Sequence, residues 1–331
     1  MGSTGPGPSA TRAAEPPSDS GGAVPARRHV RRTVWRALGA VALAALLWAV
    51  IAQAEAVAAG LRRMDPVAIV LAFGLVLAGL AANLLSWRAV LAGLGSPLPL
   101  SVAGRVYLLA QLGKYVPGSV WPILAQAELG REHGVPALRS GVAGIAALIV
   151  GLCVGAVLAA VCLAGTATSQ LREYAWGLVI VPLGLVALHP RVLQWVLDVA
   201  MRVLRRGGAP HRVSPRALVE AAAWSLVMWL LFGAQVWVLA RSIGAGGADL
   251  ALLSVGAYAA AWVVGFLVVL APAGAGPREL VLVLALGPVL PRAEALGLAL
   301  VSRVLMLVGD LLGVLVAVAV ARARRARPER A

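Results

Sequence analysis

Long apolar runs constrain this chain more than any other feature. Val67–Ser86, Ser140–Ala164 and Leu250–Leu270 are each nearly free of charge and long enough to cross a hydrocarbon core of about 30 Å as helices. Apolar residues make up 60% of the 331 residues, above the roughly 45–50% of soluble domains. The sequence therefore predicts an integral membrane protein built from helices.

The apolar runs define the expected fold class. We expect an all-α polytopic membrane protein with about eight transmembrane helices plus one or two re-entrant or broken helical hairpins. The second span should end at the aromatic–basic interface pair Trp87-Arg88. The eight expected spans are Ala37–Ala59, Val67–Ser86, Ser140–Ala164, Tyr174–Leu188, Leu218–Ala240, Leu250–Leu270, Leu280–Leu290 and Glu294–Val320.

The remaining segments divide the chain into three parts. Residues 1–33 are rich in Gly, Pro and Ser and predict a disordered cytoplasmic tail. Residues 34–320 form the transmembrane domain, and 321–331 form a basic cytoplasmic tail. The first apolar run is either a retained helix or a secretory signal cleaved near Ala52-Gln53-Ala54. The connection His189–Arg216 predicts a surface-lying basic amphipathic helix, with Val192, Val196, Val199 and Val203 at helical spacing.

The net charge of +15 gives the expected orientation. Basic residues cluster in short connections between apolar runs, an arrangement that follows the positive-inside rule rather than that of a nucleic-acid-binding protein. With both termini cytoplasmic, and Ser101–Arg131 entering and leaving on that side as a re-entrant hairpin, most arginines are internal. We expect a multi-pass protein of the cytoplasmic membrane. The external arginines would be Arg62, Arg63, Arg172, Arg241 and Arg292.

The first break in the helical pattern is QLGKYVPGSVW, Gln111–Trp121. Pro117 and Gly118 should end the helix that begins at Ser101 near Tyr115–Val116. Lys114 is the only lysine in the chain. It is either a lysine reaching for the interface from a helix end or an intramembrane cation beside a broken helix, which is usually functional.

The second break is APAGAGPRE, Ala271–Glu279. Gly274 and Gly276 permit unusual backbone angles and close approach of a ligand or of other backbone. The segment is either a plain loop with an exposed Arg278–Glu279 ion pair, or a stiff polar segment at a binding site.

The last span carries two charges, Arg303 and Asp310, seven residues apart and therefore on one helix face. Each is costly inside a bilayer, so both should face the bundle interior. They either pair with each other or with Lys114 as structural contacts, or line a path for a charged head group.

Catalytic and metal-binding patterns are missing from the sequence. The four histidines have no metal-ligand spacing, and Cys153 and Cys162 are too far apart on one helix to form a disulfide. There is no phosphate-binding loop and no nucleophile elbow. We expect no enzymatic activity, no catalytic residues, no cofactor and no metal.

Several motifs in order resemble a known family. LGKYVPGSVW is followed by ELGREHG, LHPRVL, APAGAGPREL and an intramembrane arginine. Together they resemble the transmembrane region of lysylphosphatidylglycerol synthases, a family that also includes stand-alone flippase-like proteins. The resemblance runs from about Arg36 to Arg322. Full-length synthases continue into a cytosolic aminoacyl-transfer domain, and because this chain stops at Ala331 we do not expect synthase activity.

The resemblance implies movement of a lipid between leaflets. The expected cargo is a lipid with an anionic head group, a phospholipid or a polyprenyl phosphate. The alternatives are an enzyme acting on a lipid-linked substrate and a non-transporting membrane partner subunit. Membrane lipids are the expected partners, nucleic acid is not, and a homo-oligomer or a separate partner enzyme stays open. The resemblance and the intramembrane charges together give the expected substrate-binding residues Lys114, Pro117, Gly118, Glu128, Arg131, Pro272, Gly274, Gly276, Arg278, Glu279, Arg303 and Asp310.

Overall fold

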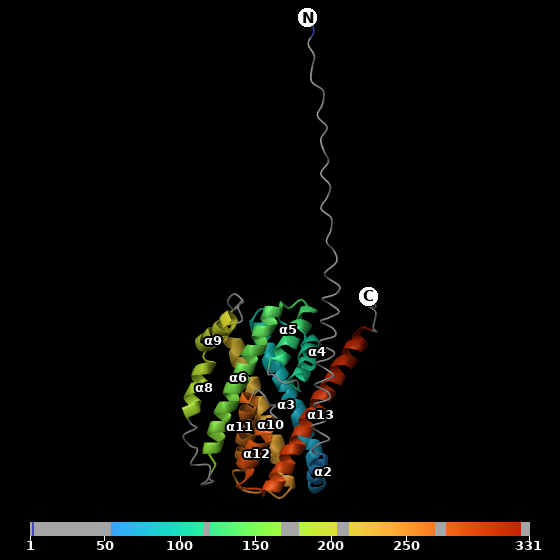
Figure 1. Cartoon of the computed structure of the whole chain (residues 1–331), viewed down its shortest axis with the longest axis vertical. Coiled ribbons are helices and arrows are strands. Elements are labelled where there is room, and N and C mark those ends of the chain that lie inside the picture. The colour runs from blue at the N-terminus through green and yellow to red at the C-terminus, as the bar shows by residue number, and fades with distance from the viewer. Residues whose placement is uncertain are drawn as a thin grey trace.

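The computed structural model describes residues 2, 54–115, 120–166, 179–203, 212–268 and 276–325 (Figure 1). Within these ranges every secondary-structure element is a helix, which confirms the all-α fold class. The helices are α2 (Ala54–Arg63), α3 (Pro66–Gly93), α4 (Leu100–Gln111), the 3₁₀ turn η1 (Leu112–Tyr115), α5 (Trp121–Arg131), α6 (Ala137–Ala164), α8 (Ile180–Leu188), α9 (Pro190–Val203), α10 (Pro215–Ser242), α11 (Leu250–Leu267), α12 (Pro277–Leu286) and α13 (Arg292–Arg325).

Polar side chains cap the first turns of two of the long helices. The Asp65 carboxylate accepts the backbone N–H of Val67 at 2.9 Å, one residue after the proline that opens α3. Ser214 accepts the N–H of Ala217 at 3.2 Å at the start of α10. These side chains satisfy backbone donors that a helix start leaves without partners.

The centre of the bundle is the antiparallel pair α3 and α10. Gly93 lies against Ala217 and Gly79 lies against Phe232, so the start of each helix meets the end of the other. The two helices also share a hydrogen bond from Ser86 Oγ to the Ala221 carbonyl at 3.0 Å. Small residues let these backbones approach closely, which is how helices associate where the solvent is as apolar as the side chains.

Two helical hairpins enter this bundle from opposite ends (Figure 1). The hairpin of α4, η1 and α5 begins at the end where α3 finishes, and η1 lies inside the bundle. The hairpin of α11 and α12 begins at the other end, where α2 lies and α10 finishes. Helix α13 runs past both hairpins and contacts α4, α12, α2 and α3.

The number of spans differs from the expectation. Within the described residues, five helices are long and apolar enough to cross a membrane: α3, α6, α10, α11 and α13. A sixth would be the pair α8 and α9, which is bent by 79°. The expected crossing at Leu280–Leu290 is not confirmed, because α12 rises only about 15 Å, too short to span the membrane by itself. The structure does not describe the run Ala37–Ala52 or, apart from Gly2, the tail 1–33. Helix α13 extends beyond the expected end of the last span, as far as Arg325.

Three local expectations also need correction. Helix α4 ends at Gln111, and the chain tightens into η1 before it reaches the expected break. Trp87 is buried and packs on Tyr107, with the two ring centroids 5.4 Å apart. It is therefore not a residue of the membrane–water interface. In α9 the buried face carries Leu193 and Leu197 rather than the valines, which are half-buried where described.

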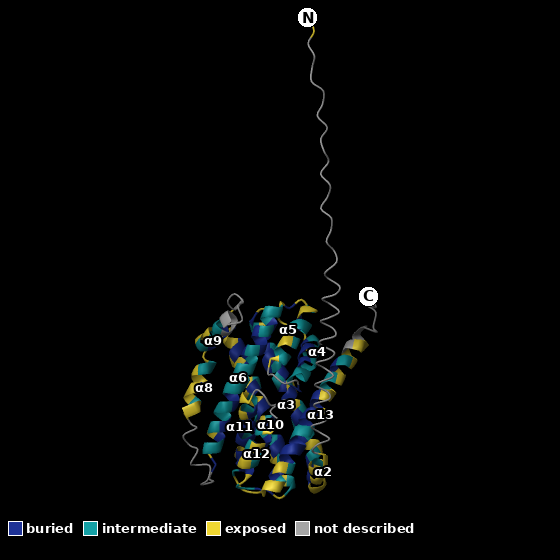
Figure 2. Cartoon of the chain, viewed as in Figure 1, coloured by how far each residue is buried: buried dark blue, intermediate teal, exposed yellow. Residues whose placement is uncertain are grey.

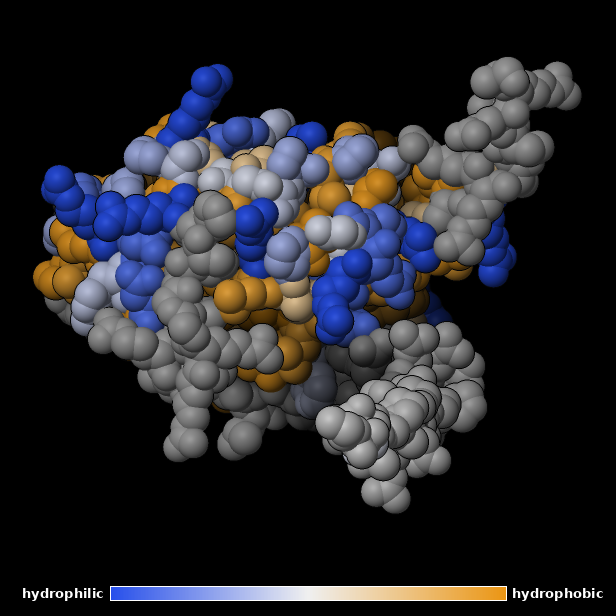
Figure 3. Space-filling view, turned by 90° about the horizontal axis from the view of Figure 1, so that it is seen from above, coloured by the Kyte–Doolittle hydropathy of each residue, from blue (hydrophilic) through white to orange (hydrophobic). Residues whose placement is uncertain are grey.

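The surface agrees with a membrane setting. Large apolar side chains such as Val70, Val219 and Leu315 point outward and are more than 60% exposed, while buried residues concentrate in the middle of the bundle (Figure 2). Seen from the end that carries α4, α5 and α9, hydrophilic residues gather on the end face, with apolar residues between and beside them (Figure 3). An apolar belt below a polar end is typical of a multi-pass membrane protein.

Close packing of α10 on α11 leads to a stability prediction. A Cβ at Gly233 would lie 2.5 Å from the Cα of Val255, so Gly233→Ala must push the two helices apart. We expect it to cost about 1–3 kcal/mol, as overpacking does. A thermal melt of the purified protein in detergent measures the effect. The control is Gly74→Ala on α3, where nothing lies within 4 Å of the new methyl group; an equal loss there would contradict the packing explanation.

Candidate functional site

Helix α13 brings two charged residues to the level of both hairpin tips. Arg303 and Asp310 lie on either side of the middle of this helix, about 10 Å apart along its axis. Asp310 is 2% exposed and the Arg303 side chain is 21% exposed, so neither points at lipid. The expectation that both face the interior is confirmed.

The tip of the first hairpin binds Asp310. Lys114 Nζ lies 2.6 Å from Asp310 Oδ2, and the Tyr115 hydroxyl donates to the same oxygen at 2.5 Å. Gly113 makes this tight turn practicable, because a Cβ there would meet the backbone of Trp121 and Pro122 at 2.9 Å. Lys114 is therefore an ion-paired cation inside the bundle, not a lysine that extends from a helix end to the interface.

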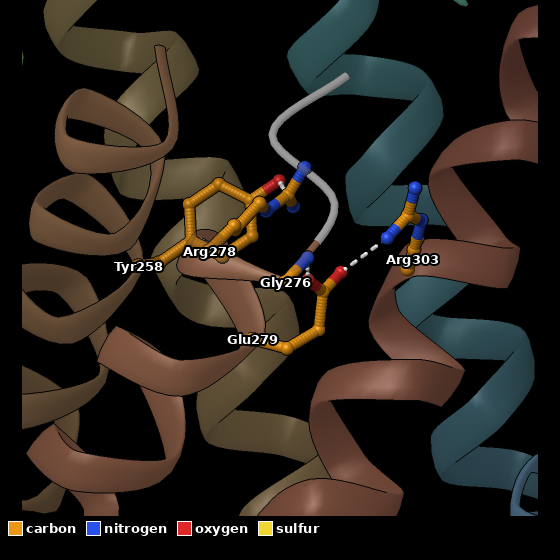
Figure 4. Close-up of polar contacts among 5 residues, drawn as sticks. All are labelled: Tyr258, Gly276, Arg278, Glu279 and Arg303. Atoms are coloured by element: carbon orange, nitrogen blue, oxygen red, sulfur yellow. Dashed lines mark hydrogen bonds and ion pairs between the residues drawn. The ribbon is translucent and has the colours of Figure 1, made fainter. Parts of the chain in front are cut away.

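The tip of the second hairpin binds Arg303 (Figure 4). Glu279 Oε1 accepts a hydrogen bond from Arg303 Nη1 at 2.7 Å. Its Oε2 accepts one from the backbone N–H of Gly276, also at 2.7 Å. Gly276 has φ +92°, a conformation that favours glycine. Glu279 is 8% exposed. The interpretation of Arg278 and Glu279 as an exposed ion pair in a plain loop is wrong.

Arg278 has a different kind of partner. Its Nη2 donates to the Tyr258 hydroxyl on α11 at 2.6 Å, and its guanidinium carbon lies 4.8 Å from the centre of the same ring (Figure 4). No ion pair joins Arg278 to a carboxylate of the described residues. Within the described residues its guanidinium meets a neutral phenol and no counter-ion, so it is the cation most open to an added anion.

The two hairpins contact α13 at neighbouring positions. Lys114 and Tyr115 reach Asp310, and Glu279 reaches Arg303, which lies seven residues earlier on the same face of α13. We call the whole group the central charged cluster. Its cations outnumber its carboxylates by three to two. Its members are Lys114, Tyr115, Tyr258, Gly276, Arg278, Glu279, Arg303 and Asp310.

The direction of two short helices adds to this positive potential. Helices α5 and α12 both begin beside the tips and run away from them towards opposite ends. The positive end of a helix dipole lies at its first turn, so both helices direct that end towards the middle of the bundle. Glu279 already occupies one N–H donor, that of Gly276 at the start of α12.

Not every expected site residue lies in the cluster. Glu128 and Arg131 are 4.0 Å apart near the end of α5, at the polar end of the bundle. Arg303 and Asp310 pair with Glu279 and Lys114 rather than with each other. The expected residues Pro117, Gly118, Pro272 and Gly274 lie outside the described residues.

Sequence reasoning missed two members of the cluster. Tyr115 is adjacent to Lys114 in the first motif, and its polar hydroxyl beside an intramembrane cation is a signal that could have marked it. Tyr258 lies in an apolar helix with no charged neighbour in sequence, and it reaches Arg278 only through the packing of α11 on α12.

The fold and the cluster define a class: a polytopic helical membrane protein with two broken hairpins that meet at a buried charged site. The sequence matches the family model described as "Lysylphosphatidylglycerol synthase TM region" over residues 37–326. Because that match covers most of the chain, the protein belongs to this family. No match was found among curated proteins.

Proposed function

We propose that this protein binds the anionic head group of a membrane lipid at the central charged cluster and moves that lipid between leaflets. The observation that carries the proposal is the charge balance. Lys114 and Arg303 are each neutralised by a buried carboxylate, whereas among the described residues Arg278 is held by Tyr258 alone. One added negative charge would complete the pairing of three cations.

The position of the cluster supports transport over simple surface binding. Discontinuous helices whose tips meet inside a bundle are the arrangement in which transporters hold charged substrates. Ion pairs between a tip and α13 can exchange partners with a phosphate, so a bound head group would compete with Asp310 and Glu279 for their cations. Such competition couples binding to movement of a tip relative to α13.

The proposal includes no catalytic step. The described part of the chain holds no group of three His, Cys, Asp or Glu side chains that could bind a metal ion. The charged side chains of the cluster are engaged in ion pairs or, for Arg278, with Tyr258, which suits recognition of a head group. The cytoplasmic orientation of both termini stays a prediction.

Leaflet exchange in proteoliposomes tests the proposal. The probe is phosphatidylglycerol with a fluorophore on one acyl chain, and quenching of the outer leaflet reports the exchange rate. We expect Arg278→Ala to slow exchange at least about tenfold, because a hydrogen bond to a charged group contributes about 1.5–3 kcal/mol. Arg278→Lys should retain part of the rate, since a point charge replaces the planar fork.

The matched control is Arg216→Ala, which removes an exposed arginine at the start of α10 and should exchange lipid like the wild type. Phosphatidylcholine labelled in the same way tests whether the head-group charge matters. A wild-type rate in Arg278→Ala would refute the role of the cluster. A wild type that binds phosphatidylglycerol without exchanging it would instead identify a lipid-binding partner subunit.

A further inference from the structure

A groove lies beside the central charged cluster, between α2, α12 and α13. Its volume is about 890 Å³, and it is open to the surface of the bundle. Its walls are mostly apolar between charged ends: Leu280 and Val283 come from α12, and Leu296 and Leu300 come from α13. Leu280 is 59% exposed and Leu296 is 43% exposed, so a large part of this apolar surface has no protein against it among the described residues.

The inner end of the groove belongs to the cluster. Gly276 and Glu279 line the groove and also form the tip that binds Arg303. The outer end is marked by Arg292, the first residue of α13. The groove thus runs from the middle of the bundle to the end of the bundle at which α13 begins.

Helix α2 forms the far wall. Gly60 lies against Gly297, and Arg63 pairs with Glu294 at 3.6 Å, so α2 runs antiparallel to α13. This pairing places Glu55 about level with Arg303. Glu55 and Ala56 therefore lie on the wall at the inner end. The close approach at Gly60 keeps α2 near α13 while a gap remains on the side of α12.

We propose that this groove holds the hydrocarbon chain of a glycerophospholipid while its head group lies in the central charged cluster. The inference rests on the proposed function. A lipid whose head enters a buried polar site must leave its chains in the hydrocarbon layer, and this requires a lateral opening next to that site. The groove supplies an apolar wall that is continuous with the cluster, and it lies in the half of the bundle at the α2 end.

Van der Waals contact, not the hydrophobic effect, selects the occupant. Lipid chains surround a membrane protein on all sides, so burial in the groove gains little apolar transfer energy. A chain in the groove gains contact on three sides and remains attached to a head group that the cluster binds. The lipid therefore exchanges with the leaflet at the α2 end.

Photo-crosslinking of phosphatidylglycerol with a diazirine in one acyl chain tests this inference in proteoliposomes. Peptide mass spectrometry should find the label on α12 and α13 at the groove, with Leu280 and Leu296 among the labelled residues. Leu296→Trp fills the groove. It should lower the labelling there to the level of lipid-facing residues outside the groove, and it should slow leaflet exchange. Val308→Trp is the control, since Val308 has a similar exposed fraction on the same helix but does not line the groove.

A second variant keeps the test decisive if Leu296→Trp fails to fold. Ala56→Trp fills the groove from the opposite wall, at an exposed position of α2 where a large side chain costs little. Loss of labelling in either folded variant, with normal labelling in Val308→Trp, supports the proposal. Equal labelling of Leu280 and Leu296 in the wild type and in the folded groove-filling variants would overturn it.

The failures of the two proposals can be told apart. If the wild-type groove takes no label while Arg278→Ala still slows exchange, the groove is not the site of the chain and the proposed function stands. If the groove is labelled but the wild type exchanges no lipid, the chain site stands and transport fails.

Discussion

Lys114→Met is expected to lower the free energy of unfolding by about 3–5 kcal/mol, the usual cost of breaking a buried ion pair from one side. The variant leaves Asp310 in the bundle at 2% exposure, with the Tyr115 hydroxyl as its one remaining partner among the described residues. Oδ1 of Asp310 already has no hydrogen-bond partner among the described residues, so the carboxylate depends on Lys114 for its compensation. Equilibrium unfolding in mixed micelles with increasing SDS measures the loss.

A double variant separates structure from function at this pair. Lys114→Met combined with Asp310→Asn removes both charges and keeps an oxygen that can accept the Tyr115 hydroxyl. We expect it to recover most of the stability that Lys114→Met loses, and to remain slow in leaflet exchange because a cation of the cluster is still missing. Arg131→Met is the control: its partner Glu128 is 4.0 Å away and Arg131 is 61% exposed, so about 0–1 kcal/mol should be lost. Equal losses for Arg131→Met and Lys114→Met would contradict the structure.

Glu279→Ala is expected to destabilise the second hairpin tip by about 3 kcal/mol or more. The substitution removes two hydrogen bonds at once, leaving the Arg303 guanidinium inside the bundle and the Gly276 N–H without its acceptor. The local effect should appear as faster amide hydrogen exchange at Gly276 and in the first turn of α12. The rest of α13 should keep its protection, because its apolar packing is unchanged.

A double variant should recover less stability at this tip than the double variant at Lys114 and Asp310 does. Adding Arg303→Met to Glu279→Ala removes the unpaired cation but does not restore an acceptor for the Gly276 N–H. Glu294→Ala is the control, since its partner Arg63 is 3.6 Å away and 64% exposed, and it should cost no more than about 1 kcal/mol. Full recovery in the double variant would mean that Glu279 acts only as a counter-ion and does not hold the start of α12.

The cluster could be predicted in part from the sequence. Intramembrane charges are expensive, so Lys114, Arg303 and Asp310 had to face protein and find partners wherever the helices packed. The breaks at residues 111–121 and 271–279 were visible because proline and glycine interrupt long apolar runs. Which side chains would pair with one another could not be predicted from the sequence. Pairing of Arg303 with Glu279, and of Lys114 with Asp310, depends on how far each hairpin enters the bundle.

The sequence by itself determined the membrane setting, the helices and the two breaks, because backbone in lipid must satisfy its hydrogen bonds locally. Tertiary structure alone decided which faces meet. Helix α3 is apolar on nearly all sides, so its pattern does not mark the side that packs on α10. Helix rotation and register decide two features of the site. They bring Tyr258 to Arg278, and they leave the groove between α2, α12 and α13. These are set by the close packing of small residues far apart in the chain, and no local pattern encodes them.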